Sequence, residues 1–254
     1  MPSRPPAGYV RVTAGRCVVV ARTELEDDAR ALLAAGTIYL AAERTPDARP
    51  LAGRGVAYSI ALPITGARVV VRHNRHGGLL APITRDCFLP PTRAPYELET
   101  SLRLAGLGVR TPPVLMYGIE SRYGVLRRAD VMTLEVTGGR DLASYMMPGE
   151  VPALRAEAWR ATRVLVRALN AAGARHHDLN VKNVLLTDGE AGLVAWVLDV
   201  DRVRFGVPHA ARVRVGNATR LLRSARKWRD ERGAVLDERE LAALGAVQDT
   251  VQER

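Results

Sequence analysis

The sequence changes its pattern near Gly138-Gly139, and this change limits the kind of fold that the chain can form. In front of it, segments rich in β-branched residues predict strands at 10–22, 58–72, 114–117 and 125–136. Behind it, apolar residues recur mainly at helical spacing. Because strands and helices are separated along the chain, we predict an α+β protein with a β-rich front lobe, residues 1–137, and a mainly helical back lobe, residues 138–254.

Turn and cap signals define further elements. The turn Pro63-Ile64-Thr65-Gly66 predicts a hairpin within 58–72. Front-lobe helices are expected at 24–35, which begins with acidic residues, and at 95–105, which Gly106 follows. In the back lobe we expect a helix that contains Trp159 and stops at Gly173, a small hairpin from 184–186 and 194–198, and a basic helical end from Asn217 onward.

The composition is that of a folded protein. Of 254 residues 47% are hydrophobic, which is enough for one well-packed unit or two closely joined lobes. No apolar run reaches the roughly 20 residues of a membrane-spanning helix, and the first residues do not resemble a signal peptide, so we expect a cytoplasmic protein. The two cysteines, Cys17 and Cys87, do not predict a disulfide framework. The net charge of +10 favours anionic partners, such as nucleotide phosphates, nucleic acid or an acidic membrane surface.

The segment 176–183 carries the strongest functional signal. His176, Asp178, Leu179 and Asn183 fit the pattern H-x-D-L-x-x-x-N of a kinase catalytic loop. In that pattern the aspartate orients the acceptor hydroxyl and takes its proton, and the asparagine ligates a metal ion through its amide oxygen. We therefore predict Asp178 as the catalytic base and Asn183 as a ligand of Mg²⁺.

A second aspartate follows at a suitable distance. Asp199 comes sixteen residues after Asn183 (199 − 183), at the end of the apolar run 194–198. The hairpin expected between them would return Asp199 to face Asn183, so we predict Asp199 as the second metal ligand. The competing interpretation is a simple helix cap and turn at 178–180.

These motifs, together with a segment of the front lobe, point to a family. They are 177–180 with Asn183, Asp199-Val200-Asp201-Arg202, the segment 71–79 with the sequence VRHNRHGGL, and Gly53-Arg54-Gly55. In these motifs the chain resembles the lipopolysaccharide kinase family, and within it the 3-deoxy-D-manno-octulosonic acid (Kdo) kinases, over about residues 50–230. The resemblance implies a protein-kinase-like fold of two lobes. It also implies transfer of phosphate from ATP, with Mg²⁺, to a sugar hydroxyl, with Kdo of the lipopolysaccharide inner core or lipid A as the expected acceptor.

The resemblance extends to the site that holds the nucleotide phosphates. Gly53 and Gly55 would lie in the loop over the phosphates, with a plain turn as the alternative. Arg72 would take the place of the usual phosphate-binding lysine, with an exposed strand-end arginine as the alternative. The sequence supports this substitution independently, because both lysines, Lys182 and Lys227, come after Asp178.

Two further assignments concern the nucleotide. Glu99 is the candidate partner of Arg72, and Glu97 is the alternative. Glu135 and Val136, near the connector, would offer backbone groups to the adenine.

The remaining features concern the acceptor. Asp201 has three possible roles: metal ligand, partner of Arg202, or turn cap. No Phe-Gly follows Asp199 and no A-P-E element comes later, which argues against a protein substrate. We expect a lipid-linked sugar and no nucleic acid, and the sequence predicts no oligomeric state. A basic cluster faces an anionic membrane on the inner side of the inner membrane, binds the acidic sugar, or is a solvated helix face; it comprises Arg212, Arg214, Arg220, Arg223, Arg226, Lys227 and Arg229.

Two other classes of function remain open from the sequence. One is a different small-molecule phosphotransferase on the same fold, of the heptose or aminoglycoside type. The other is a non-catalytic kinase-like binding module.

Overall fold

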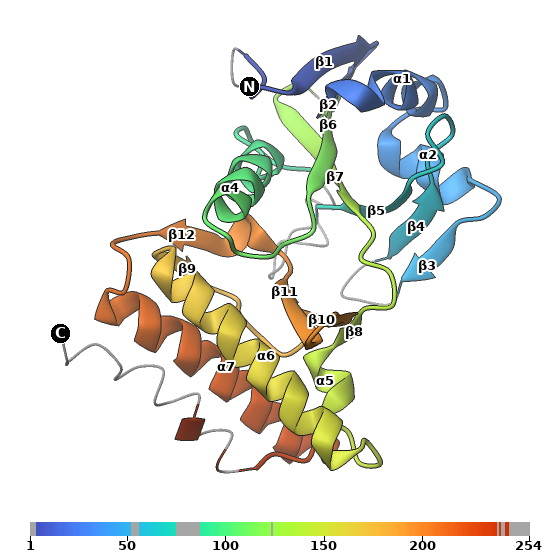
Figure 1. Cartoon of the computed structure of the whole chain (residues 1–254). Helices are drawn as coiled ribbons and strands as arrows, with labels where there is room; N and C mark the ends of the chain where they lie inside the picture. Colours follow the sequence, from blue (N-terminus) through green and yellow to red (C-terminus); the bar gives the residue numbers. More distant parts are fainter. Residues whose placement is uncertain are drawn as a thin grey trace. The chain divides into compact units, whose positions relative to one another are not determined.

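A computed structural model describes residues 4–51, 56–74, 87–122, 124–237, 239 and 242–243 (Figure 1). The chain forms two compact units. The first contains Met1–Leu102 and Pro113–Glu135, and the second contains Arg103–Pro112 and Val136–Arg254. Within the described residues, no helix combines the length and the apolar character needed to cross a membrane.

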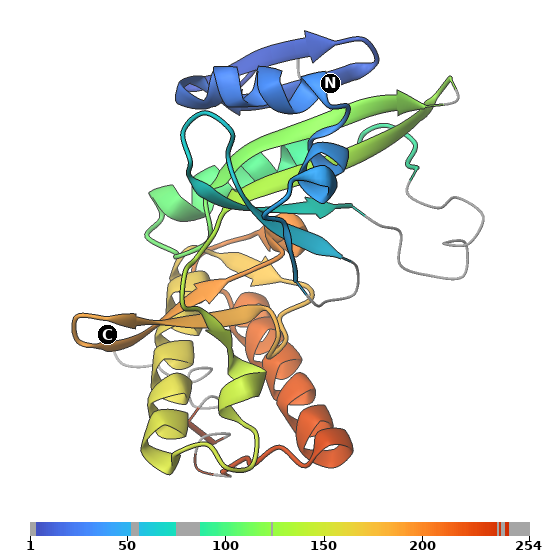
Figure 2. The ribbon, with the colours of Figure 1, turned by 90° about the vertical axis from the view of Figure 1, so that its right-hand side faces the viewer.

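The first unit is built on a seven-stranded antiparallel sheet with the strand order β1-β2-β6-β7-β5-β4-β3. Its long central pair, β6 and β7, is plain in Figure 2. The strands are β1 (Tyr9–Ala14), β2 (Cys17–Arg22), β3 (Arg49–Leu51), β4 (Ala57–Ala61), β5 (Arg68–His73), β6 (Val114–Arg122) and β7 (Leu126–Leu134). The helical segments are η1 (Thr23–Leu25), α1 (Glu26–Ala34), α2 (Ile38–Arg44) and α4 (Ala94–Gly106), whose last turn belongs to the second unit.

Helices cover both faces of this sheet, and the alternation of side chains decides which residue faces which helix. Val69 and Val71 of β5 belong to the core under α1 and α2. Because successive side chains of a strand point to opposite faces, Arg72 lies on the other face, where α4 packs. The same alternation places Val20 of β2 in the α4 core and its neighbours Val19 and Ala21 in the α1–α2 core.

The second unit is mainly helical. Its helices are α5 (Leu142–Tyr145), α6 (Pro152–Ala171) and α7 (Ala211–Arg232), and α6 and α7 run side by side in both views (Figures 1 and 2). Two small sheets accompany them, with the strand orders β11-β10-β8 and β12-β9. The short elements are β8 (Arg140–Asp141), β9 (Ala174–His176), β10 (Val184–Gly189), β11 (Gly192–Val197), η2 (Val200–Arg202) and β12 (Val203–Phe205).

One apolar core joins these elements. Trp159, Leu165 and Leu169 of α6 pack there with Leu221 of α7. The segment Arg103–Pro112 joins the same core through Leu104 and Val109, which explains why it belongs to this unit although the sequence boundary was placed near residue 138.

The main elements predicted from the sequence are confirmed: the hairpins β4–β5 and β10–β11, the helices α1, α4 and α6, and the strands β6 and β7. Two predictions are corrected. The segment 10–22 is a hairpin, because Gly15 adopts a left-handed conformation (φ 54°) between β1 and β2. The last long helix begins at Ala211 and not at Asn217.

Candidate active site

The loop 177–183 holds the backbone of Asp178 by two side-chain amides. The Nδ2 atoms of Asn180 and Asn183 both donate to the carbonyl oxygen of Asp178, at 2.9 Å each. Asn180 Oδ1 in turn accepts from the backbone N–H groups of Lys182 (2.9 Å) and Asn183 (3.2 Å). Asn180 was not among the predicted site residues, but it stabilises the conformation of the loop that carries Asp178.

The predicted metal ligands Asn183 and Asp199 are brought together by the backbone. The N–H of Leu198, the residue before Asp199, donates to the carbonyl oxygen of Asn183 at 2.9 Å. Because Asn183 uses its Nδ2 to bind Asp178, its Oδ1 is the atom left for a ligand, and no described residue donates to it. Asp199 adopts a left-handed conformation (φ 54°, ψ 48°), which is uncommon for a residue other than glycine and recurs at active sites.

His176 connects the two parts of this site. Its buried ring accepts a hydrogen bond at Nδ1 from the N–H of Asp178 (3.1 Å) and donates from Nε2 to the carbonyl oxygen of Leu198 (2.9 Å). These two roles require a neutral imidazole with its proton on Nε2. Burial, the largest cause, lowers the pKa of His176 and favours this neutral form.

Behind the loop lies a buried amide that no sequence motif predicts. Asn217 of α7 accepts the N–H of His176 at Oδ1 (2.9 Å). Its Nδ2 donates to the carbonyl oxygen of Ala174 (2.9 Å) and to Asn170 Oδ1 on α6 (3.0 Å). Asn217 shares the buried face of α7 with Val213 and Leu221, so its polar side chain at an apolar helical position was the available signal.

Asp201 makes one of the contacts considered for it. Its Oδ2 lies 3.7 Å from Arg202 Nε, so it pairs with Arg202. Its carbonyl oxygen also accepts from Arg204 Nη1 at 3.4 Å.

In the first unit, Arg72 forms its ion pair with Glu97 of α4. This corrects the preference for Glu99, which is exposed on the same helix. The reason is the helical period: Glu97 lies next to Leu98 and one turn after Ala94, both buried against the sheet, and Glu99 falls beyond that face. Arg72 also donates from Nη1 to Asn74 Oδ1, at 3.2 Å.

A buried polar network lies on the other face of β5, next to Arg72. His73 Nδ1 pairs with Asp130 of β7, which is directly opposite in the sheet, and His73 Nε2 accepts from Arg128 Nε at 3.0 Å. Asp130 Oδ2 accepts the N–H of Tyr39 at the start of α2 (3.2 Å), and the Tyr39 hydroxyl donates to the carbonyl oxygen of Val56 (3.0 Å). The network therefore links β5 to Val56, the first described residue after the segment 52–55. Gly53 and Gly55, the predicted phosphate loop, lie outside the described residues.

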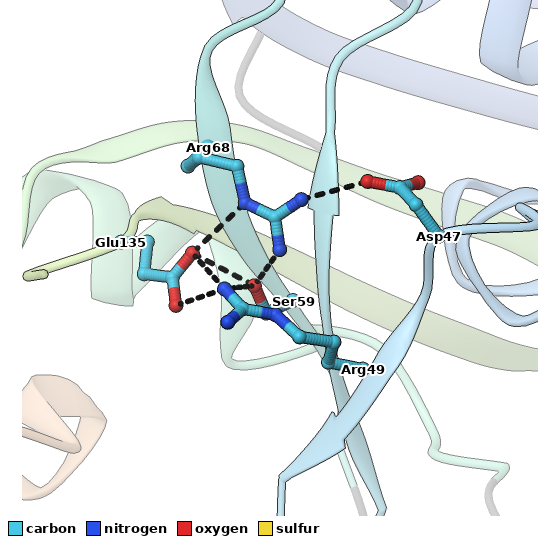
Figure 3. A network of polar contacts seen from close by, with 5 residues as sticks. All are labelled: Asp47, Arg49, Ser59, Arg68 and Glu135. Carbon is cyan, nitrogen blue, oxygen red and sulfur yellow. Dashed lines mark hydrogen bonds and ion pairs between the residues drawn. The ribbon is translucent and has the colours of Figure 1, made fainter.

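Glu135, at the end of the first unit, binds three side chains of the sheet (Figure 3). Its carboxylate accepts from Ser59 Oγ (2.7 Å), Arg68 Nε (3.3 Å) and Arg49 Nη2 (3.3 Å). Arg68 extends the network to Asp47 (2.7 Å). The backbone N–H of Glu135 donates to the carbonyl oxygen of Arg68 at 3.0 Å, so this donor, one of the groups considered for adenine, is already used.

These elements define a class of fold, the kinase-like fold. A solved structure described as WaaP in complex with acyl carrier protein is similar to this chain with a TM-score of 0.56 and 18% sequence identity, and covers 88% of this chain and 86% of that one. At this identity the likeness establishes the fold, and it confirms the predicted kinase-like class.

The family follows from sequence. The model of the lipopolysaccharide kinase (Kdo/WaaP) family matches residues 45–242, and the chain belongs to this family. A 3-deoxy-D-manno-octulosonic acid kinase of Stenotrophomonas maltophilia (strain K279a) is 34% identical over 215 residues, 82% of this chain and 81% of that protein. The kinase of the same name from Haemophilus influenzae (strain PittEE) is 30% identical over 181 residues, 69% of this chain and 73% of that protein. The chain is thus a lipopolysaccharide kinase by family, a phosphotransferase whose acceptor is a sugar hydroxyl.

Proposed function

We propose that the protein transfers the γ-phosphate of ATP to a hydroxyl of Kdo in the inner core of lipopolysaccharide or in Kdo-bearing lipid A. The names of its relatives suggest this sugar. The observation that carries the proposal is the hydrogen bond from Leu198 to Asn183, because it joins the segment of Asp199 to the loop of Asp178. One base and two oxygen ligands in one place are what phosphoryl transfer to an alcohol requires.

Asp178 is the proposed catalytic base. Its carbonyl oxygen is held by Asn180 and Asn183, and its N–H by His176. A backbone fixed at both groups limits the positions that the carboxylate can reach. Asp178 therefore orients the acceptor hydroxyl for in-line attack and accepts its proton.

Asn183 and Asp199 are the proposed holders of Mg²⁺. The donor set fits this ion: an amide oxygen to which no described residue donates, and a carboxylate on a residue in a strained backbone conformation. Among the described residues, no three His, Cys, Asp or Glu side chains form a group that could hold a metal ion by themselves. Mg²⁺ commonly binds through one or two protein oxygens together with substrate phosphates, and it neutralises the charge of those phosphates.

The first unit supplies the proposed nucleotide contacts. Arg72 binds the phosphates as a bidentate donor, and Glu97 orients its guanidinium. Gly53 and Gly55, which lie outside the described residues, are the proposed backbone contacts of the phosphates. Since the N–H of Glu135 is used by Arg68, adenine would contact the carbonyl oxygen of Glu135 and the backbone of Val136.

The base assignment is tested with Asp178→Asn. Purified variant and wild type are mixed with labelled ATP, Mg²⁺ and Kdo-bearing lipid A. We expect the variant to bind ATP as the wild type does and to lose phosphate transfer by about 10²–10⁴-fold, the usual contribution of general base catalysis. Transfer at the wild-type rate would contradict the assignment.

The acceptor is tested with a panel of sugars and the wild-type protein. Kdo-bearing lipid A should be phosphorylated, and heptose and aminoglycoside acceptors should not. Transfer to heptose or to an aminoglycoside in preference to Kdo would show that the protein is a phosphotransferase for that small molecule instead.

A further inference from the structure

Positively charged side chains gather on one face of the two-stranded sheet β9–β12, directly before Asp178. In the register of this sheet Arg204 lies opposite Arg175, and Val203 lies opposite His176. His177 continues the pairing by donating its N–H to the carbonyl oxygen of Arg202 at 3.0 Å. Because His176 and Val203 are buried, the alternation of the strands puts Arg175, His177 and Arg204 together on the opposite face.

A third arginine, Arg220 of α7, lies one helical turn after Gly216, the residue over which the Arg175 side chain passes, and so contributes to the same cluster. The pKa of His177 is lowered by burial and then by the positive charges of Arg175, Arg204 and Arg220, in that order. These three guanidinium groups therefore act on the same imidazole, which immediately precedes the proposed base. Two arginines directly opposite one another in a sheet repel each other, so the arrangement by itself opposes folding.

The helix α7 makes room for this cluster. A Cβ atom on Gly216 would lie 2.6 Å from Arg175 Nε, so the side chain of Arg175 passes directly over the backbone of this glycine. Glycine inside a helix is destabilising relative to alanine. Its presence here allows the guanidinium of Arg175 to lie against α7, which distinguishes the cluster from arginines that extend into solvent.

No carboxylate of the described residues forms an ion pair with Arg175 or Arg220. Asp201, the carboxylate nearest in sequence to Arg204, pairs with Arg202, and its backbone carbonyl oxygen accepts from Arg204 Nη1 at 3.4 Å. The charges of Arg175 and Arg220 are thus not neutralised by a carboxylate of the described residues, and an anion from outside the chain could pair with them.

We propose that Arg175, Arg204 and Arg220 form a binding site for an acidic group of the acceptor, an oxyanion that the guanidinium groups bind by charge-assisted hydrogen bonds. This inference rests on the proposed function, because it assumes a sugar-acid acceptor. The favoured group is the carboxylate of the sugar acid, since it belongs to the same sugar as the reacting hydroxyl and the cluster adjoins Asp178. A phosphate of the lipid has the same chemistry and is the other possible source.

The first test is kinetic. Arg175→Gln and Arg220→Gln should each raise the KM for Kdo-bearing lipid A by about tenfold or more, the range for a lost charged hydrogen bond, and leave the KM for ATP unchanged. Gly216→Ala should raise the same KM without removing a charge, because it displaces the Arg175 side chain. Arg167→Gln, an exposed arginine on α6, is the matched control and should change neither constant. An unchanged acceptor KM in Arg175→Gln and Arg220→Gln would overturn the inference.

The source of the anion is decided with modified acceptors. If the carboxylate is the group bound, the wild type should have a raised KM for the methyl ester of the acceptor, similar to the KM of Arg175→Gln for the natural acceptor. If a lipid phosphate is the group bound, the wild type should have the same raised KM for the dephosphorylated acceptor. Either result supports the site, and full activity on both modified acceptors contradicts it.

A binding measurement separates this inference from the proposed function. The protein is labelled with ¹³C-histidine, the His177 signal is assigned with His177→Gln, and free Kdo or inorganic phosphate is added without ATP. At least one anion should shift the His177 signal in the wild type, and the shift should be absent in the Arg175→Gln, Arg220→Gln double variant. If the wild type transfers no phosphate to Kdo but the shift occurs, the proposed function fails and the anion site stands. If neither anion shifts the signal, the site is refuted whatever the activity.

Discussion

At the scale of single residues, the candidate site is organised by polar side chains that bind backbone groups. Asn180 and Asn183 hold the carbonyl oxygen of Asp178, and His176 spans from the N–H of Asp178 to the carbonyl oxygen of Leu198. Each of these bonds is buried or half-buried, so the loss of one partner leaves a polar group without water. Single substitutions in this set should therefore affect both stability and activity.

The ion pair between Arg72 and Glu97 gives a residue-scale prediction. Glu97→Gln removes the charge that orients Arg72, so the KM for ATP should rise by about tenfold, in line with the loss of a partly buried charge-assisted bond. Glu99→Gln is the matched control, two residues further on the same helix and exposed, and it should leave the KM unchanged. Steady-state kinetics with varied ATP makes the comparison. A larger effect of Glu99→Gln would restore the pairing first preferred from the sequence.

His176 gives a pH-dependent prediction. Burial lowers its pKa in the folded protein below the ordinary value of 6.5, so just below pH 6.5 the unfolded chain binds a proton that the folded chain does not. The stability due to the neutral ring is fully present above pH 6.5 and is lost as the pH falls below it. The urea concentration at the midpoint of unfolding should therefore decrease as the pH is lowered from about 7 to about 5.5. The decrease should be smaller in His176→Gln.

The pKa of His177 is also lowered, so both His176 and His177 contribute to the change of the wild-type urea midpoint with pH. His177→Gln, measured over the same range, isolates the share of His176. If His176→Gln kept the full wild-type slope, the neutral buried ring would not be its source.

At the scale of elements, the start of β9 depends on how α6 ends. Gly173 follows α6 in a left-handed conformation (φ 65°), and its carbonyl oxygen accepts the N–H of Gly206 at 2.8 Å. A side chain at residue 173 would collide with the backbone of Gly206. Since β9 leads into the loop of Asp178, this tight turn helps to set where the loop begins.

Gly173→Ala should therefore be strongly destabilising. The left-handed conformation costs alanine about 1–2 kcal/mol and the collision adds to it, so we expect a loss of about 3 kcal/mol or more in urea unfolding. Gly149→Ala is the control, because Gly149 is also left-handed (φ 94°) but has open space around its Cβ position. It should lose only about 1–2 kcal/mol. Equal losses would show that the contact with Gly206 adds nothing.

At the scale of the whole molecule, the net charge of +10 favours anionic surfaces. Arg223, Arg226 and Lys227 line a groove on α7 together with Asp230 and Glu231, and Lys227 pairs with Glu231 at 3.8 Å. We propose that these three cations make peripheral contact with an anionic membrane that carries the lipid-linked sugar, on the inner face of the inner membrane.

The proposal predicts binding to vesicles that contain anionic lipid and not to neutral vesicles. Each basic residue near such a surface contributes about 1 kcal/mol, so the triple change of Arg223, Arg226 and Lys227 to Gln should weaken binding by about 100-fold. The control changes Arg30, Arg44 and Arg160 to Gln, which removes the same charge from exposed positions elsewhere. Flotation of the protein with vesicles measures both, and an equal loss in the control would mean that only net charge matters.

Much of the site could be predicted because its signal is local. Asp178 and Asn183 lie in one loop, and Asp199 follows after a single hairpin, so the spacing along the chain nearly determines their proximity. The absence of a front-lobe lysine points to Arg72 as the phosphate-binding cation, and this role stays a prediction. The choice between Glu97 and Glu99 failed because it depends on which face of α4 meets the sheet, and the neighbours Ala94 and Leu98 were the clue to that face.

The sequence by itself determined the separation of strands from helices, the order of helix, loop and hairpin, and the residue types available for phosphoryl transfer. These follow from periodicity and spacing, which are properties of neighbouring residues. Only the tertiary structure decided that Asn217 of α7 supports His176, that Tyr39 reaches Val56, and that Arg175 and Arg204 stand opposite each other. Each of these contacts joins elements that are distant along the chain. Which polar groups meet there depends on how the elements pack, and local pattern does not encode it.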